Sequence, residues 1–280
     1  MKDAPEIPAQ AIEPSLWDGL RRFTAARIAL GHTGTSLPTA PHLAFQCAHA
    51  QARDAVHIGL DIPPIEAAAA QRGWTVLKVH SAAADRLIYL QRPDLGRQLA
   101  QGSRDLLRQH GGACDVLFVL ADGLSARAIQ KHALPLLDAL QPALDGESWR
   151  LGPLVVAEQG RVAIGDEIGA LLGARLVVVM IGERPGLSAH DSLGIYLSYS
   201  PRVGLANSDR NCISNVRPEG LSYAQAAHTL RYLMHESLRR QLSGTLLKDE
   251  GGEVARAEVS TTVSAWALDC PSRTAPPRSD

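Results

Sequence analysis

The stretch VLFVLADGLS, residues 116–125, together with the helical pattern that follows it to Leu140, decides the fold. Its first five residues are apolar without a break, which is typical of a strand buried on both faces of a parallel sheet. Residues 122–125 are turn formers, and residues 125–140 carry apolar side chains at helical spacing. The stretch therefore predicts a strand, a tight turn and a helix, the unit that builds α/β sheets.

The same alternation continues toward the C-terminus. Short apolar runs at 154–157 and 176–181 predict two more strands, with a helix over 166–172 between them. A further strand is expected at 195–199, a loop at 205–212, and a long helix over 222–242 that Ser222 caps and Gly244 follows. This order favours a Rossmann-like, mostly parallel sheet with flanking helices.

The region before the sheet has a helical character. Apolar residues at helical spacing predict a helix over 16–30, capped by Ser15 and stopped by Gly31, and two more helices over 44–54 and 64–72. We therefore expect a flexible segment over 1–14, a small, mainly helical N-terminal subdomain over 15–110, an α/β domain over 111–247, and a C-terminal tail over 248–280.

Composition argues against several classes of partner. The 280 residues include 28 Lys and Arg against 29 Asp and Glu, so a formal net charge of −1 gives no field to attract nucleic acid. The longest apolar runs fall well short of the roughly 20 residues that a membrane helix needs. The proline-rich start does not resemble a signal peptide, and the cysteines form no CxxC pair. We expect a cytoplasmic protein that binds neither membrane nor nucleic acid.

Three segments lie where an α/β sheet usually binds its ligand, beyond the carboxyl ends of its strands. They are DGLS at 122–125, GERPGL at 182–187 and NCISN at 211–215, each expected to be a loop. In the first, Asp122 or Ser125 is suited to capping the next helix. The two glycines of the second form either a simple turn or a place for close approach by a bulky ligand.

Other chemistries have weaker signals. No GxSxG, GxGxxG or GxxxxGK[ST] string occurs, and Cys212 as a nucleophile with His190 lacks an acid and an oxyanion motif. His228 and His235 share a helix face without a further ligand, so no metal site is predicted. Five arginines suited to binding a phosphate stay unassigned, because isolated arginines are usually surface charges: Arg21, Arg22, Arg27, Arg92 and Arg97.

Six motifs occur in an order and spacing that resemble one protein family. They are RPDLGR (92–97), DGLS (122–125), GRV (160–162), GERPGL (182–187), YSPR (199–202) and CISN (212–215). Together they resemble the small subunit, or light chain, of ethanolamine ammonia-lyase, and the resemblance extends from about residue 15 to about residue 244.

The resemblance implies a heteromeric lyase that converts ethanolamine to acetaldehyde and ammonia by radical chemistry. Adenosylcobalamin would lie between a large catalytic subunit and this chain, in a higher-order hetero-oligomer. The implied cofactor-binding residues are Val162, Glu183 and Cys212, with no catalytic residue and no metal ligand on this chain. No DxHxxG string occurs, so we expect the cofactor's own base to stay on cobalt. Packaging in a bacterial microcompartment stays open.

Three alternatives stay open beside that interpretation. The chain would be a stand-alone α/β module for a nucleotide or flavin if it bound such a ligand instead of a corrinoid. It would act as a cysteine-dependent hydrolase if Cys212 had a depressed pKa. It would be a purely structural brace if a large subunit alone held the cofactor, and Glu183→Ala would then leave cobalamin affinity unchanged.

Overall fold

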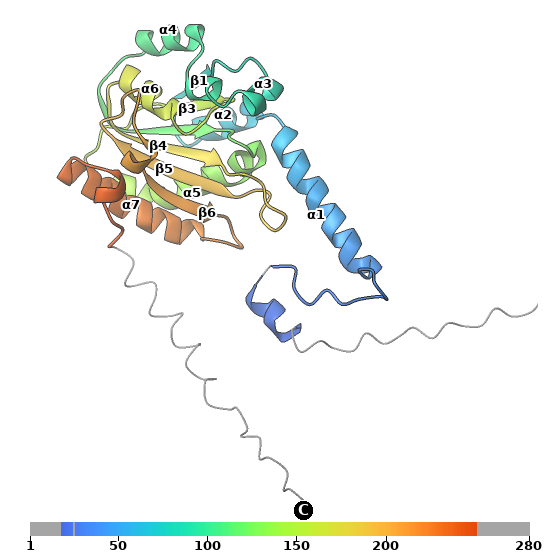
Figure 1. Ribbon diagram of the computed structural model, residues 1–280. Helices are drawn as coiled ribbons and strands as arrows, with labels where there is room; N and C mark the ends of the chain where they lie inside the picture. Colours follow the sequence, from blue (N-terminus) through green and yellow to red (C-terminus); the bar gives the residue numbers. More distant parts are fainter. Residues whose placement is uncertain (1–17, 25, 251–280) are drawn as a thin grey trace, which may run out of the picture.

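The computed structural model describes residues 18–24 and 26–250, which form one six-stranded sheet covered by helices (Figure 1). The strand order is β1-β3-β2-β4-β5-β6. The first four strands in this order are parallel, whereas β5 is antiparallel to both of its neighbours. The expected mostly parallel α/β sheet with flanking helices is confirmed. The strands are β1 (Val76–His80), β2 (Cys114–Ala121), β3 (Leu154–Glu158), β4 (Ala174–Gly182), β5 (Leu193–Tyr199) and β6 (Asn211–Val216).

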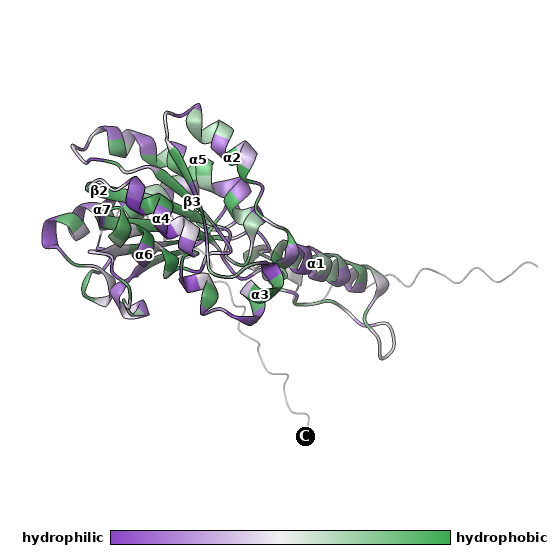
Figure 2. Cartoon of the chain, turned by 90° about the horizontal axis from the view of Figure 1, so that it is seen from above, coloured by the Kyte–Doolittle hydropathy of each residue, from purple (hydrophilic) through white to green (hydrophobic). Residues whose placement is uncertain are grey.

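Helices cover both faces of this sheet. One face packs against α2, α5 and α7, and the other packs against α4 and α6. Figure 2 shows apolar strands enclosed between helices whose outer surfaces are hydrophilic. The bounds are α1 (Thr39–His57), α2 (Ile62–Ala70), α3 (Arg86–Gln91), α4 (Gln101–Gln109), α5 (Ala126–Asp145), α6 (Ile164–Leu171) and α7 (Tyr223–Arg240), with short 3-10 turns η1 (Asp18–Phe23), η2 (Leu95–Arg97), η3 (Asn207–Asp209) and η4 (Gly244–Leu246).

The central strands β2 and β4 are buried because neighbouring side chains enter opposite cores. Phe118 and Val178 pack with α5, whereas Val119 and Val177 pack with α6. All four are at most 2% exposed. A strand covered on both sides has no position for a polar residue, which explains the unbroken apolar runs.

The N-terminal part is an arm outside the sheet. Helix α1 projects from the body (Figure 1), and Ala55 is its one buried residue. The helices predicted over 44–54 and 64–72 are present as α1 and α2. The helix predicted over 16–30 is wrong in its described part: η1 ends at Phe23, and Ala29 has φ of 53°, which an α-helix excludes. Helical spacing of apolar residues does not stabilise a helix unless its apolar face packs on another part of the protein.

Two strands lie where none was expected. β1 is within residues 15–110 yet pairs with β3, so the sheet takes strands from both sides of the proposed boundary at 110, and that division stays a prediction. β6 replaces the loop expected at 211–215. As an edge strand it needs apolar residues on one face only, so its run is mostly polar. The segment 1–14 and most of the tail lie outside the described residues.

Candidate functional site

The loops after β2 and β4 pack closely against each other at the carboxyl edge of the sheet. Leu124 N–H donates to the Gly182 carbonyl at 3.0 Å, and a Cβ at Gly182 would collide with the Ser125 carbonyl. Gly123 has φ of 58°, which favours glycine. The space beside Gly182 is therefore filled by the backbone of the loop after β2 and is not open to a ligand.

Asp122 is the buried centre of this edge and is 1% exposed. Its carboxylate accepts N–H groups from Gln159 at 3.0 Å and Gly160 at 2.9 Å, with Arg86 Nη1 at 3.4 Å. Burial raises the pKa of Asp122 to about 6, against the attraction of Arg86 and these N–H groups. Asp122 thus fixes the loop after β3. Ser125 occupies the N-cap position of α5, but its hydroxyl donates to the His190 carbonyl at 2.9 Å.

A buried tyrosine holds the GRV segment in place. Tyr89 is fully buried, and the guanidinium carbons of Arg86 and Arg161 lie over its ring, at 4.7 Å and 4.1 Å from the ring centroid. Its hydroxyl donates to the Gly160 carbonyl at 3.2 Å, and burial raises its pKa. Cation–π contacts of this kind fix the guanidinium planes. The buried Tyr89 thus holds Arg161 in place, and with it the backbone of the next residue, Val162.

Glu183, immediately after β4, connects the antiparallel strands. Its carboxylate accepts the hydroxyls of Ser192 and of Ser214, the latter at 2.6 Å, and the Asn215 N–H at 3.2 Å. The side chain is half-buried. These donors come from the start of β5 and from β6, so Glu183 is held in one orientation by two separate strands.

A polar cluster supports the loop that follows Glu183. Asp191 accepts Lys131 Nζ at 2.7 Å and lies 3.7 Å from Nε2 of the fully buried His132, whose Nδ1 is 2.6 Å from the Tyr223 hydroxyl. His132 Nε2 has no hydrogen-bond partner among the described residues, and burial lowers the pKa of His132. The cluster therefore contains a buried histidine whose pKa is below its ordinary value.

His132 is expected to make folding stability pH-dependent. With the native pKa below 6.5, stability is lost as pH falls from 6.5 toward the native pKa, because over that range the unfolded chain binds the proton and the native chain does not. The slope is at most about 1.4 kcal/mol per pH unit. Urea unfolding from pH 7.5 to 5 should show a shallower pH dependence for His132→Gln, whereas parallel curves would contradict a neutral native His132.

Cys212 lies on the side of β6 that faces away from α7. Cys212 and Ser214 are exposed, whereas Ile213 between them is 6% exposed and packs in the core. Cys212 is opposite Tyr196 of β5, whose pKa burial raises to about 12. Helix α6 covers β4 but leaves this side of β6 accessible.

A hollow of about 570 Å³ opens on that side and brings Val162 and Cys212 together. Glu183 is not in its lining but lies near it, because a Cβ added at Gly194 would meet both the Glu183 carboxylate, at 3.1 Å, and the ring of the lining residue Tyr196, at 3.3 Å. The residues predicted from sequence therefore occupy one neighbourhood. The lining is Pro93, Arg97, Arg161, Val162, Ala163, Tyr196, Leu205, Ala206, Asn207, Arg210 and Cys212.

The Cys212 thiol is poorly suited to nucleophilic attack. Burial of the thiol raises its pKa, and the nearby charge of Glu183 raises it further. A nucleophilic cysteine needs the opposite shift, so the hydrolase alternative finds no support. Both Cys212 and Cys47 are exposed, and because of its raised pKa we expect iodoacetamide at pH 8 to modify Cys212 more slowly than Cys47, as measured by peptide mass spectrometry. Faster modification of Cys212 would contradict the raised pKa.

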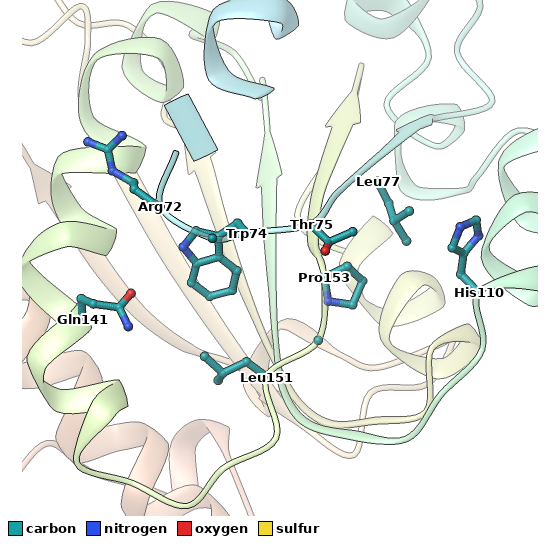
Figure 3. Close-up of a pocket in the computed structure, with 10 residues that line it drawn as sticks. Arg72, Trp74, Thr75, Leu77, His110, Gln141, Leu151 and Pro153 are labelled. Carbon is teal, nitrogen blue, oxygen red and sulfur yellow. The ribbon is translucent and has the colours of Figure 1, made fainter. Parts of the chain in front are cut away.

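Two other hollows lie away from the six motifs. One, of about 480 Å³, lies at the amino ends of β1 and β3, where Trp74, Thr75 and Pro153 meet (Figure 3). Its Arg72 is already paired with Asp138 at 2.6 Å. The other, of about 560 Å³, is lined by the C-terminal part of α5 and the N-terminal half of α7. Neither includes Val162, Glu183 or Cys212.

Two features are absent from residues 18–24 and 26–250 of the structure. No helix in this part is long and apolar enough to cross a membrane. No group of three or more His, Cys, Asp or Glu side chains there is arranged to hold a metal ion.

The fold and the hollow define an α/β protein whose candidate ligand surface lies beside the antiparallel edge of a mostly parallel sheet. A sequence profile of the ethanolamine ammonia-lyase light chain (EutC) matches residues 14–248. Three ethanolamine ammonia-lyase small subunits are similar: from Azotobacter vinelandii (61% identity, 86% of this chain, 91% of the relative), Pseudomonas syringae pv. tomato (57%, 89% and 89%) and Ralstonia nicotianae (54%, 92% and 97%). The chain belongs to the ethanolamine ammonia-lyase light chain family.

Proposed function

We propose that this chain is the small subunit of an adenosylcobalamin-dependent ethanolamine ammonia-lyase and that it holds cobalamin at the interface with a large catalytic subunit. The observation that carries the proposal is the hollow shared by Val162 and Cys212, with Glu183 beside it. Family membership supports the same assignment. The overall reaction would convert ethanolamine to acetaldehyde and ammonia.

The lining of the hollow fits a corrin. Such a ring is broad and apolar with amides around its rim, and Val162, Leu205 and Tyr196 supply an apolar wall. Glu183 supplies an oriented carboxylate that can accept an amide N–H.

The cofactor, when bound, would supply the radical by Co–C homolysis. This chain's residues would bind and orient: Val162 and Cys212 by packing, and Glu183 by hydrogen bonding. We assign no catalytic residue and no proton transfer to it. The large subunit would close the hollow against water, in a higher-order hetero-oligomer.

We further propose that the cofactor binds base-on. The residues lining the hollow include no histidine, and the sequence has no DxHxxG string. In Co(II)-loaded complex, the nitrogen hyperfine splitting of the EPR signal should be unchanged when the protein's histidines carry ¹⁵N. A changed splitting would identify a protein histidine on cobalt and contradict the base-on state.

The direct test is co-expression with the large subunit and an assay for acetaldehyde from ethanolamine. Product that requires both chains and adenosylcobalamin would support the proposal. Turnover by either chain alone would contradict it, and selective binding of a nucleotide or flavin to this chain would favour the stand-alone module. Cytoplasmic location and microcompartment packaging stay predictions that cell fractionation would test.

A further inference from the structure

From the geometry of the same hollow we infer a subsite for an anionic phosphate, formed by Arg97, Arg161 and Arg210. All three line the hollow, and no Asp or Glu is among its lining residues. Three arginines without a facing carboxylate favour a ligand that carries negative charge. Of the three, only Arg97 belonged to the arginines left unassigned from sequence.

Arg210 provides a buried donor with a fixed direction. Its side chain is 3% exposed, and its Nη2 pairs with Asp166. Its Nη1 donates to the Ala206 carbonyl at 2.6 Å, while Nε is buried and has no partner among the described residues. Because Asp166 balances its charge, Arg210 contributes an oriented N–H and little net charge. An unpartnered buried donor usually indicates an absent ligand or water.

Arg161 and Arg97 provide the net charge. Arg161 lies 4.1 Å above the Tyr89 ring, and its Nη2 donates to the Tyr89 carbonyl at 3.2 Å. Its Nε is a second buried donor without a partner, and no described carboxylate pairs with it. Arg97 is exposed at the rim, and its guanidinium has no hydrogen-bond or ion-pair partner among the described residues. Two uncompensated positive charges therefore face the same space.

Backbone groups add to this electrostatic environment. The N–H groups of Val162 and Ala163, just before α6, donate to no described residue. They lie at the positive end of the helix dipole, which favours anions. The phosphate subsite would thus adjoin Val162, the residue proposed to contact the corrin.

The occupant we assign is the phosphodiester in the nucleotide tail of cobalamin, so the inference rests on the proposed function. A phosphodiester carries one negative charge and two free oxygens, which suits donors from more than one arginine. The corrin and its tail would then occupy one continuous hollow. A free phosphate has the same chemistry, and the experiment distinguishes the two.

The test compares two corrinoids on the complex co-expressed with the large subunit. Cyanocobalamin has the phosphodiester, whereas dicyanocobinamide lacks the nucleotide tail. Equilibrium dialysis should show that Arg161→Gln raises the dissociation constant for cyanocobalamin about tenfold or more, the effect of one charge-assisted hydrogen bond. Arg97→Gln should act in the same direction, with less effect. Affinity for dicyanocobinamide should be unchanged in both, and Arg161→Lys should restore part of the loss.

Because the Arg97 side chain is exposed, Arg97→Gln tests the subsite without disturbing the fold. Arg108 on α4 is an exposed arginine outside the hollow, so Arg108→Gln is the matched control and should leave both affinities unchanged. Equal losses for both corrinoids, or no loss for either, would overturn the subsite while leaving cobalamin binding intact. A wild-type complex that binds neither corrinoid would instead overturn the proposed function. Inorganic phosphate should compete with cyanocobalamin in the wild type. Phosphate binding without competition would overturn the assignment to the cofactor's tail.

Discussion

Replacing Glu183 with alanine is expected to raise the dissociation constant for cobalamin about ten- to a hundredfold in the complex with the large subunit. The expectation follows from losing a hydrogen bond to an ionised acceptor, worth about 1.5–3 kcal/mol. The hydroxyls of Ser192 and Ser214 and the Asn215 N–H already occupy much of the carboxylate. A carboxylate offers about four lone-pair sites, so about one is left for a corrin amide.

Two comparisons separate that contact from a folding defect. Glu183→Gln keeps the shape and one carbonyl acceptor, so its loss of affinity should fall between those of wild type and Glu183→Ala. The exposed Glu219→Ala is the matched control and should bind as wild type does. Absorbance titration with cyanocobalamin measures each constant, and circular dichroism checks the fold. Unchanged affinity in folded Glu183→Ala would favour the structural brace.

The central sheet was predictable because burial on both faces leaves a local signal. The run at 176–181 has no polar residue, since Val177 and Val178 enter different cores. The edge of the sheet lacks that signal. In β6 only Ile213 and Val216 are buried, so the strand has the composition of a loop. The error over 16–30 has the opposite cause, because apolar spacing was present without a surface to pack on.

The motifs located the candidate site, but not the contacts that hold it. Val162, Glu183 and Cys212 were predicted from the family resemblance, and the fold places Val162 and Cys212 in one hollow with Glu183 close to it. Arg86, Asp122 and Gln159 are widely separated in sequence, and nothing local in Asp122 indicates that its partners lie beyond β3. Long-range polar contacts of this kind depend on strand order, which periodicity does not specify.

Asp122→Ala is expected to give the largest loss of stability, about 3–5 kcal/mol, as for other broken buried ion pairs. The raised pKa of Asp122 shows that desolvation outweighs its attraction to Arg86. The ion pair itself therefore stabilises little. The loss arises from what the variant leaves behind: the charge of Arg86, 13% exposed, and the unpaired N–H groups of Gln159 and Gly160.

Urea denaturation of the complex-free chain, or of the whole complex if the chain needs its partner, measures this loss. Asp122→Asn should lose less, because its carbonyl still accepts one of the two N–H groups. The exposed Asp105→Ala, which breaks a surface pair on α4, should change little. A loss for Asp122→Ala no larger than that control would contradict the role of Asp122. It would mean that the loop carrying Val162 is held by Tyr89 and Arg161 without the buried carboxylate.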